Sequence, residues 1–569
     1  MSEGRVAAAR WQPFESLRGY RRSWLRPDVI AGLTVWAVLV PEALAYATIA
    51  GVPPVVGLYA AVPSLVLYAL AGSSRHLVVG PMSATAALSA ALITPLAGAD
   101  GGRYIALTTA LAIATGVVGL IAGLLRLGFV AAFISEPVLK GFIIGLALVI
   151  IIGQVPKLFG IEKHEGNFFE QAWGVLTGLG DTQWRTLLVG GLSLVLVLGL
   201  KRWLPLVPGS LVAVVAGIVA VALFDLDDHG VEIVGTIESG LPVPGLPDAG
   251  FHDYLDLLGP AVGVLLIGFA EGLGAAKTYA AREGYEVDPN RELIGLGAAN
   301  LGSGLNAGMV VNGSLSKTAV NGSAGAKSQV SGLVVAVLTV FTLLLLTGLF
   351  EQLPEATLAA VVIAAVIELV DIAALRRFYR VWSHWLGSIY GHAARADFVA
   401  AVTAMMGVLI FDTLPGLLIG AGVAILLLVY RTSQPHIAAL APSDGLWLDT
   451  ARHPGLRGRP EALVVRVEAG LCFVNADFVR HRIEELCTER TRLVVLDAET
   501  SPAIDVTAAS MLIDLRDTLA RRRIVFRIAR SIGQFGEELT AAEAGSHSIA
   551  VYPTIADALG DTTMPHGKG

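Results

Sequence analysis

Residues 310–321 read VVNGSLSKTAVN, a polar segment containing a glycine within a part of the chain that is otherwise mostly aliphatic. A bilayer offers no water to unpaired backbone groups, so non-helical backbone at mid-depth survives only where protein or a wet cavity surrounds it. If this region spans a membrane, the segment either supports tight helix packing, as glycine and serine commonly do, or lines a site.

The composition around this segment is that of a membrane protein. The chain has 569 residues, of which 54% are hydrophobic and only 15% charged, and its mean hydropathy of +0.68 exceeds that of a water-soluble globule. Residues 106–125, 187–200 and 331–349 carry almost no charge and approach the length that a helix needs to cross roughly 30 Å of hydrocarbon. The net charge is −7, and no basic footprint of nucleic-acid binding is visible.

The basic residues predict the orientation in the membrane. With the N-terminus inside, lysine and arginine fall in every second loop, except for Lys157 and Lys163 in an outward one. Roughly fourteen spans, two of them short, satisfy this pattern with both ends in the cytoplasm. No cleavage site follows the basic leader, so we expect no signal peptide and a plasma-membrane location. Residues 381–396 predict a helix lying at the interface. The inward basic residues are Arg75, Arg126, Lys201, Arg202, Lys277, Arg282, Lys327, Arg376, Arg377, Arg380 and Arg431.

The composition changes after about Gln434. From Ala462 onward, the short runs LVVRV, LVVLD and IVFRI alternate with charged helical stretches, which indicates a small cytoplasmic α/β domain with a mostly parallel sheet. Cys472 and Cys487 lack the spacing of a metal or redox motif. The predicted parts are a cytoplasmic N-terminal segment at 1–28, a transmembrane domain at 29–434, a linker at 435–461, the α/β domain at 462–560 and a tail at 561–569.

A second polar break, LVVGPMSATAAL, occupies residues 77–88. Each break follows a span that bears a lone carboxylate, Glu42 in the first case and Glu271 in the second. Glu42 and Ser83 are 41 positions apart, and Glu271 and Ser314 are 43 apart. Two such units in corresponding places predict an inverted repeat of about seven spans.

Helices that begin at mid-membrane predict an anion site. Each directs free N–H groups and the positive end of its dipole into the cavity, which favours an anion by roughly 0.5 to 2 kcal/mol per terminus. The glycine in each break lets the backbone approach closely, and Ser83 and Ser314 can cap a helix or donate hydrogen bonds. Lys317, one turn into the second half-helix, adds a full positive charge. Tight packing remains the alternative for either break alone.

Three stretches resemble one known family. PEALAYATIAGVPPVVGLYAA at 41–61 and NGSLSKTAVN at 312–321 resemble motifs of the SulP anion transporters, known in animals as solute carrier family 26, and the C-terminal part resembles a STAS domain. The resemblance covers residues 26–559. It implies an α-helical membrane protein of 14 spans, arranged as 7+7 inverted repeats with core and gate domains, plus a small α/β STAS domain. It also implies an elevator movement and a homodimer.

The resemblance places the anion between the half-helices of spans three and ten. This chain departs from the family at Glu42, where relatives have glutamine or an apolar residue, and at Lys317, where arginine is usual and would grip an oxyanion in a bidentate manner. Sodium-dependent bicarbonate carriers have aspartate and a nearby hydroxyl where this chain has Glu271 and Ala275, which favours proton over sodium coupling. The anion-binding residues so implied are Glu42, Tyr46, Ser83, Ala84, Gly313, Ser314 and Leu315, joined by Lys317.

The intramembrane acids are candidates for proton coupling, because such residues are costly and tend to mark ion paths. Glu271 is the first candidate and Glu42 the second. The alternative for Glu271 is a permanent ion pair with Lys317 that serves only structure. Farther along the chain, Glu136 and Lys140 are four residues apart with the acid first, which predicts a local helical pair.

Two further motifs have a structural and a functional interpretation. In IDVTAASML, Thr507 matches the position that is phosphorylated in the anti-sigma-factor antagonists, and the alternative is that Asp505 and Thr507 simply cap a helix. GLGAANLGSG at 295–304 loosely resembles a dinucleotide-binding loop, but it precedes no βαβ unit, so close helix packing is the better interpretation.

The leading functional prediction is a secondary transporter that takes up an inorganic oxyanion, sulfate first, with protons. Bicarbonate or a small dicarboxylate is the alternative substrate, because helix termini select for charge and size. An anion channel or voltage-responsive motor and a STAS-linked membrane receptor are alternative functions. We expect no enzyme, no metal site and no cofactor. The expected partners are the anion, protons, membrane lipid, a second copy of the chain and an unknown cytosolic partner of the STAS domain, with no nucleic acid.

Overall fold

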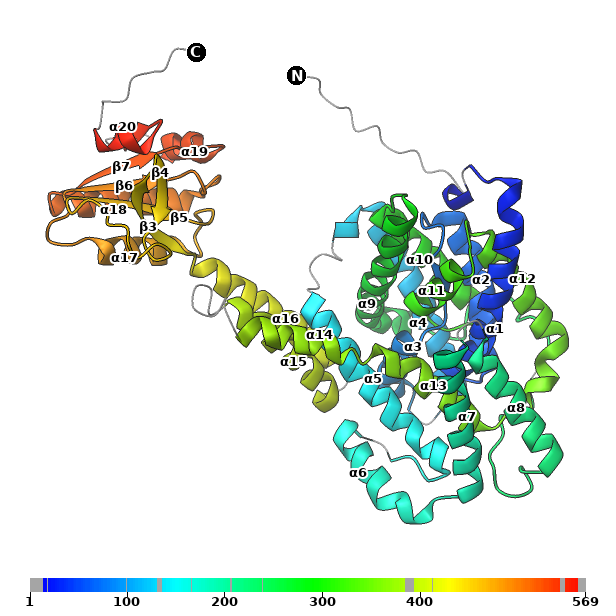
Figure 1. Cartoon of the computed structure of the whole chain (residues 1–569). Helices are drawn as coiled ribbons and strands as arrows, with labels where there is room; N and C mark the ends of the chain where they lie inside the picture. The colour runs from blue at the N-terminus through cyan, green and yellow to red at the C-terminus, as the bar shows by residue number, and fades with distance from the viewer. Residues whose placement is uncertain are drawn as a thin grey trace. The chain divides into compact units, whose positions relative to one another are not determined.

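The computed structural model describes residues 14–17, 19–98, 100–129, 136–164, 166–204, 207–237, 239–383, 393–411, 413–542 and 548–560. The chain divides into two compact units, Met1–Val423 and Ala424–Gly569 (Figure 1). Most of the interfacial helix predicted at 381–396, the first 13 residues and the tail at 561–569 lie outside the described residues.

In the described residues of the first unit, the regular elements are helices and two short strands. Six of its described helices are long and apolar enough to cross a membrane, and shorter apolar helices accompany them. The first half comprises α1 (Leu25–Ile49), α2 (Val55–Ala71), β1 (Val78–Gly80), α3 (Ser83–Ala97), α4 (Gly101–Leu124), α5 (Glu136–Phe159), α6 (Phe168–Gly178), α7 (Trp184–Trp203) and α8 (Gly209–Phe224).

The second half repeats the order of the first, with two helices followed by a strand and a helix. It comprises α9 (Phe251–Glu283), α10 (Pro289–Leu305), β2 (Asn312–Ser314), α11 (Leu315–Ser323), α12 (Val330–Phe341), α13 (Glu355–Val366), α14 (Ile372–Ser383), α15 (Ala393–Phe411) and α16 (Thr413–Ser433). The last helix runs into the second unit. This duplicated order is the one that the two sequence breaks predict, while the exact number of fourteen spans stays a prediction.

Small residues let the helices of the first unit approach closely. α10 packs against both α4 and α2. A Cβ atom at Gly297 would lie 2.6 Å from the Leu120 amide nitrogen, and one at Gly119 would lie 2.9 Å from the Gly297 Cα. Side chains at these positions would force the helices apart. The packing interpretation of residues 295–304 is therefore confirmed.

The predicted local pair of Glu136 and Lys140 is wrong. Lys140 Nζ lies 3.1 Å from Asp371 Oδ2, and Glu136 Oε1 lies 3.6 Å from a guanidinium nitrogen of Arg377. Asp371 also accepts a hydrogen bond from the Ala374 amide at the start of α14, so its carboxylate is held in place for the lysine. The Lys140–Asp371 pair thus ties α5 to the α13–α14 connection, and the Glu136–Arg377 pair ties it to α14 itself, both far from α5 in the sequence.

The second unit is a six-stranded sheet covered by helices, with strand order β4-β3-β5-β6-β7-β8. Strands β5 to β8 are parallel, whereas β3 pairs antiparallel with both β4 and β5. Its strands and helices are β3 (Ile437–Ser443), β4 (Leu446–Asp449), β5 (Ala462–Val467), α17 (Ala476–Leu486), β6 (Leu493–Asp497), α18 (Val506–Arg521), β7 (Val525–Ala529), α19 (Phe535–Ala542), β8 (Val551–Tyr552) and α20 (Ile555–Leu559).

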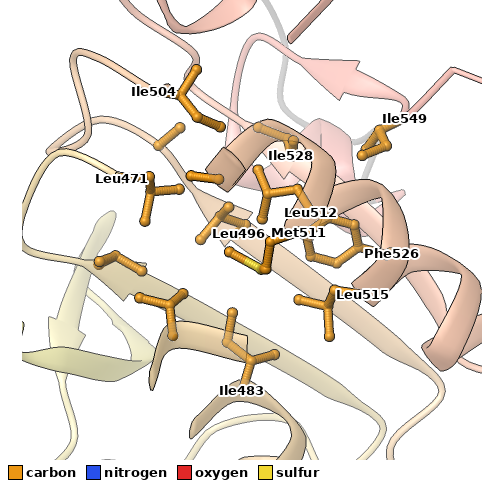
Figure 2. Packing of buried hydrophobic residues seen from close by; sticks show 14 of the residues in the cluster. Leu471, Ile483, Leu496, Ile504, Met511, Leu512, Leu515, Phe526, Ile528 and Ile549 are labelled. Carbon is orange, nitrogen blue, oxygen red and sulfur yellow. The ribbon is translucent and has the colours of Figure 1, made fainter. Parts of the chain in front are cut away.

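Apolar side chains of this sheet pack beneath the helices on one face. Figure 2 shows Leu512 and Leu515 of α18 and Ile483 of α17 gathered over Leu496 and Phe526 of the strands. On the other face α20 covers a smaller cluster. The alternation of short apolar runs and amphipathic helices in the sequence therefore predicted this unit correctly.

The stretch 435–461, predicted as a linker, contributes two strands to the sheet. β3 and β4 form a hairpin whose turn is Asp444-Gly445, and both turn residues have positive φ, 47° and 81°. Asp-Gly is a strong signal for a two-residue hairpin. The sequence analysis overlooked this hairpin because it placed the start of the α/β domain at the first apolar run, at Ala462.

Candidate functional site

Two short strands lie at the breaks predicted at residues 77–88 and 310–321. They pair antiparallel, with Val78 opposite Ser314 and Gly80 opposite Asn312. β1 leads into α3, and β2 leads into α11. Because the strands are antiparallel, the helices leave the ladder at opposite ends, and both N-termini point back toward it. The two interrupted helices predicted from the sequence are therefore confirmed.

Polar side chains of α11 hold the first break in place. Thr318 Oγ1 accepts a hydrogen bond of 3.0 Å from the Val78 amide. Asn321 Nδ2 donates to the His76 carbonyl oxygen, also at 3.0 Å. Thr318 and Asn321 are three residues apart and so lie on one face of the helix. The second half-helix thus satisfies backbone groups of the first break, and the two breaks form a single structure.

Asn300 of α10 performs the same task for the second break. Its Oδ1 accepts a hydrogen bond of 2.9 Å from the Val311 amide, and its Nδ2 donates to the Val311 carbonyl at 2.9 Å. These bonds pair backbone groups that precede β2 and that no helix serves. The irregular backbone therefore survives in an apolar setting because a buried amide completes its hydrogen bonds.

Lys317 connects the two halves of the site. Its side chain is 1% exposed, and its Nζ lies 2.9 Å from Oε2 of Glu42 on α1. The same ammonium donates to the Pro81 carbonyl at 3.1 Å and lies 4.9 Å from the centre of the Tyr46 ring. The alternative sequence prediction, which paired Lys317 with Glu271, is wrong, because Lys317 pairs with Glu42. A buried positive charge from the second break is thus held at the first break.

Glu271 lies on α9 beside the second break. The next residue, Gly272, packs directly on β2, since a Cβ atom at Gly313 would lie 2.9 Å from the Gly272 Cα. Glu271 Oε2 is buried and has no hydrogen-bond partner in the part of the chain that the structure describes. An unpaired buried carboxylate is costly unless it is protonated or meets a bound partner. The two acids that precede the breaks therefore differ, because Glu42 forms an ion pair with Lys317, whereas Glu271 forms no ion pair within the described residues.

A cavity of about 250 Å³ opens beside the Glu42–Lys317 pair. Glu42 of α1 and Ser316 of α11 line one side, and Ser210 of α8 and Lys201 of α7 line another. Hydroxyl and ammonium groups are suited to an oxyanion, because both donate hydrogen bonds. The cavity thus joins the ion pair to a lining that an anion can use.

The remaining predicted anion-site residues lie around the same ladder. Gly313 and Ser314 belong to β2, and the buried Ser83 and Ala84 are the first two residues of α3. Leu315, at the start of α11, is 50% exposed. The structure therefore gathers both half-helix starts, Tyr46 and the ion pair in one region, while their role in anion binding stays a prediction.

Thr507 belongs to the second unit. It is an exposed residue in the first turn of α18. Asp505 Oδ1 accepts a hydrogen bond of 2.8 Å from the Ala508 amide, which identifies Asp505 as the N-cap. The capping interpretation is confirmed for Asp505, and phosphorylation of Thr507 stays a prediction.

Sequence reasoning missed the residues that support the breaks. Thr318 and Asn321 recur at helical spacing inside the quoted motif, so their common face was a readable signal. Asn300 lies within GLGAANLGSG, which we interpreted by its glycines alone. A polar side chain among such glycines was the available hint, because a buried amide must find partners.

Comparison with known proteins places the chain. Residues 25–384 match the sulfate permease family, and residues 453–558 match the STAS domain. The chain belongs to the sulfate permease family. It is 37% identical over 565 residues to a probable sulfate transporter of Mycobacterium tuberculosis (strain CDC 1551 / Oshkosh), covering 97% of this chain and 99% of the relative. It is 30% identical over 548 residues to the chloroplastic sulfate transporter 4.1 of Arabidopsis thaliana, covering 91% and 77%.

Solved structures show the same fold. The murine solute carrier 26 family member A9 anion transporter matches with a TM-score of 0.84 at 21% identity, over 95% of this permease and 91% of that chain. The transmembrane domain of the cyanobacterial bicarbonate transporter BicA matches with a TM-score of 0.59 at 23% identity, over 71% and 98%. This permease is therefore a multi-pass membrane protein of a transporter family, not an enzyme, and it carries a C-terminal STAS domain.

Proposed function

We propose that this permease is a secondary active transporter that carries sulfate into the cell together with protons. The observation that carries the proposal is the Glu42–Lys317 ion pair at the junction of two half-helix N-termini. Glu271 lies on α9 beside the second break, and its buried Oε2 has no hydrogen-bond partner among the described residues. The relatives named as sulfate transporters support sulfate as the substrate.

The charges at the site favour coupling to protons. Lys317 is matched by Glu42, so no net positive side-chain charge from that pair remains for an anion. The helix N-termini then supply the attraction, which is modest, at roughly 0.5 to 2 kcal/mol each. An ionised Glu271 would oppose the anion, whereas a protonated Glu271 would not. Uptake of a proton with each anion therefore removes the repulsion.

We propose an elevator movement for the transport step. The cavity beside the ion pair lies between α1 and α11 on one side and α7, α8 and α13 on the other. α1, β1, β2 and α11 are tied together by the hydrogen bonds and the ion pair described above. They would move as one body past α7, α8 and α13. The resemblance to the family supports a homodimer in the plasma membrane with both termini in the cytoplasm.

Uptake into proteoliposomes tests the proposal. Radiolabelled sulfate would be supplied to the purified full chain with and without an inward proton gradient, and with excess bicarbonate, fumarate or chloride as competitor. We expect accumulation that the gradient stimulates and that a protonophore abolishes. Entry of a competitor without sulfate would overturn the substrate, uptake indifferent to the gradient would overturn the coupling, and binding without flux would favour a receptor.

A further inference from the structure

A second cavity, of about 500 Å³, lies at the end of α4, against α9 and the start of α10. It is separate from the cavity beside the ion pair, and the two share no lining residue. Its lining combines two basic side chains, an amide and apolar groups. These lining residues include Arg126, Phe129, Leu273, Gly274, Lys277 and Asn290.

The two basic side chains of this cavity are available to a ligand. Arg126 and Lys277 are exposed, and neither forms an ion pair with another residue in the described ranges. They come from segments far apart in the sequence, because Arg126 lies just beyond α4 and Lys277 lies on α9. Because both line one cavity, a single anionic group bound there can contact both.

The backbone fixes the position of Arg126. Its φ is 61°, a left-handed conformation that a non-glycine residue adopts at some cost. The turn is held because the Arg126 amide donates to the Gly123 carbonyl and the Gly128 amide donates to Asn290 Oδ1 at 2.9 Å. The arginine is thus held at the mouth of the cavity by hydrogen bonds from both α4 and α10.

Apolar side chains surround the basic ones. Leu124 and Leu125 are 73% and 65% exposed, and Phe129 is 59% exposed. Leu124 is the last residue of a helix long enough to cross the membrane, so Arg126 follows two residues after the span ends. Lys277 lies one turn beyond Leu273 and Gly274 on α9. The cavity therefore places positive charge at the edge of the hydrocarbon, with apolar surface on the membrane side.

We propose that this cavity binds the headgroup of an acidic phospholipid, with the phosphate between Arg126 and Lys277 and the acyl chains against Leu124, Leu125 and Phe129. Basic pockets between transmembrane helices at the membrane boundary suit such headgroups, because the lipid supplies both a phosphate and an apolar anchor. A soluble phosphate would use the basic residues but leave the apolar ones exposed. The site does not depend on which anion the permease carries.

Native mass spectrometry of the full chain, titrated with phosphatidylglycerol or phosphatidylcholine, tests this site. We expect the wild-type chain to retain phosphatidylglycerol in preference to phosphatidylcholine. Replacing both basic residues, R126Q/K277Q, should lower that retention about tenfold or more, since each basic residue near a membrane surface adds to the binding of an acidic lipid. R202Q/R282Q is the matched control. It removes the same charge from two other exposed arginines outside the cavity, and it should retain the lipid.

A second variant tests the space rather than the charge. Nothing lies within 4 Å of a Cβ atom built at Gly274, which lines the cavity. The larger side chain of G274L would therefore take up cavity space, and leucine has a better helix propensity than glycine. This variant should also lose phosphatidylglycerol. The proposal is overturned if R126Q/K277Q and G274L both retain the lipid, if both lipids bind equally, or if soluble glycerol 1-phosphate displaces the lipid as readily as phosphatidylglycerol does.

Discussion

The two interrupted helices share a frame but differ at their starts. α3 has 15 residues and no side chain that caps its N-terminus, whereas α11 has nine and is capped by Ser314, whose Oγ accepts from the Lys317 amide at 3.2 Å. α3 contains no charged residue, while α11 contains Lys317. The two halves therefore share the strand-then-helix geometry but differ in the capping and charge of the helix that follows. The first half-helix has uncapped backbone amides at its start, whereas the second has a capped start and a lysine that is paired with Glu42.

The acids that precede the breaks differ in the same way. Glu42 of the first half is paired, and its partner comes from the second half. α3 of the first half contains no lysine or arginine that could pair with Glu271 in the corresponding way, and no ion pair of Glu271 is found in the part of the chain that the structure describes. A duplicated fold thus produces one acid with a cationic partner and one acid for which the described residues contain no ion pair. The following substitutions test whether this asymmetry carries the function.

The largest effect is expected from K317M, which removes the cation and leaves Glu42 buried and unpaired. Breaking a buried ion pair from one side costs about 3 to 5 kcal/mol, because the remaining charge is uncompensated. We expect sulfate uptake to be abolished and the purified chain to melt at a lower temperature. Uptake into proteoliposomes and thermal unfolding in detergent measure the two consequences.

The double variant E42Q/K317M separates stability from function. Removing both charges leaves no uncompensated group, so the melting temperature should recover toward that of the wild type. Uptake should stay low if the cation serves the anion. Normal uptake by the double variant would show that the ion pair is only structural. The difference in charge between the two half-helices would then play no part in transport.

The next effect concerns the two acids. E271Q should abolish stimulation by an inward proton gradient, while E42Q should keep it. For one coupled proton, each pH unit of gradient supplies about 1.36 kcal/mol, or about tenfold in accumulation. Wild-type uptake should therefore fall as the external pH rises, and E271Q should give a flat profile. The ratio of uptake with and without the gradient, at several pH values, is the measurement. Retained stimulation in E271Q would place coupling elsewhere.

A smaller effect is expected from glycine substitution at the ladder. In G313A the new Cβ would lie 2.9 Å from both the Gly272 Cα and Leu77 Cδ2, and such overpacking costs about 1 to 3 kcal/mol. Uptake should fall about tenfold as β2 shifts from α9, since 1.4 kcal/mol corresponds to tenfold. G274A is the matched control because its Cβ meets nothing within 4 Å. Equal uptake by the two variants would contradict the close approach.

Much of this architecture was readable from the sequence because its signals are local. The polar breaks, the lone acids before them and the glycine-rich helix packing each reside in one stretch of about ten residues. The parallel strands of the second unit were equally plain from their short apolar runs. The β3–β4 hairpin was also readable, from Asp444-Gly445, and was overlooked in favour of a composition boundary.

The partners of the charged residues were not readable in the same way. Lys317 faces Glu42, which is 275 positions away, and Lys140 faces Asp371, which is 231 positions away. Helical spacing predicts neighbours within one helix only, so it favoured Glu136 for Lys140. Only the packing of helices from the two halves decides which acid meets which cation. That is why the sequence predicted the components of the site, while its alternative prediction of an ion pair for Lys317 named the wrong acid.

The smallest effect tests the caps of the two half-helices. S314A removes the hydroxyl that accepts from the Lys317 amide, and loss of such a cap costs about 1 kcal/mol. S83A removes a hydroxyl that forms no cap bond, since the N-cap of α3 is Met82, so stability should not change. We expect a lower melting temperature for S314A alone. If sulfate binds at the uncapped start of α3 and also meets the Ser83 hydroxyl, S83A should raise the sulfate concentration needed for half-maximal uptake. If both variants lowered the melting temperature equally, the two helix starts would be equivalent, which would contradict the proposed difference between them.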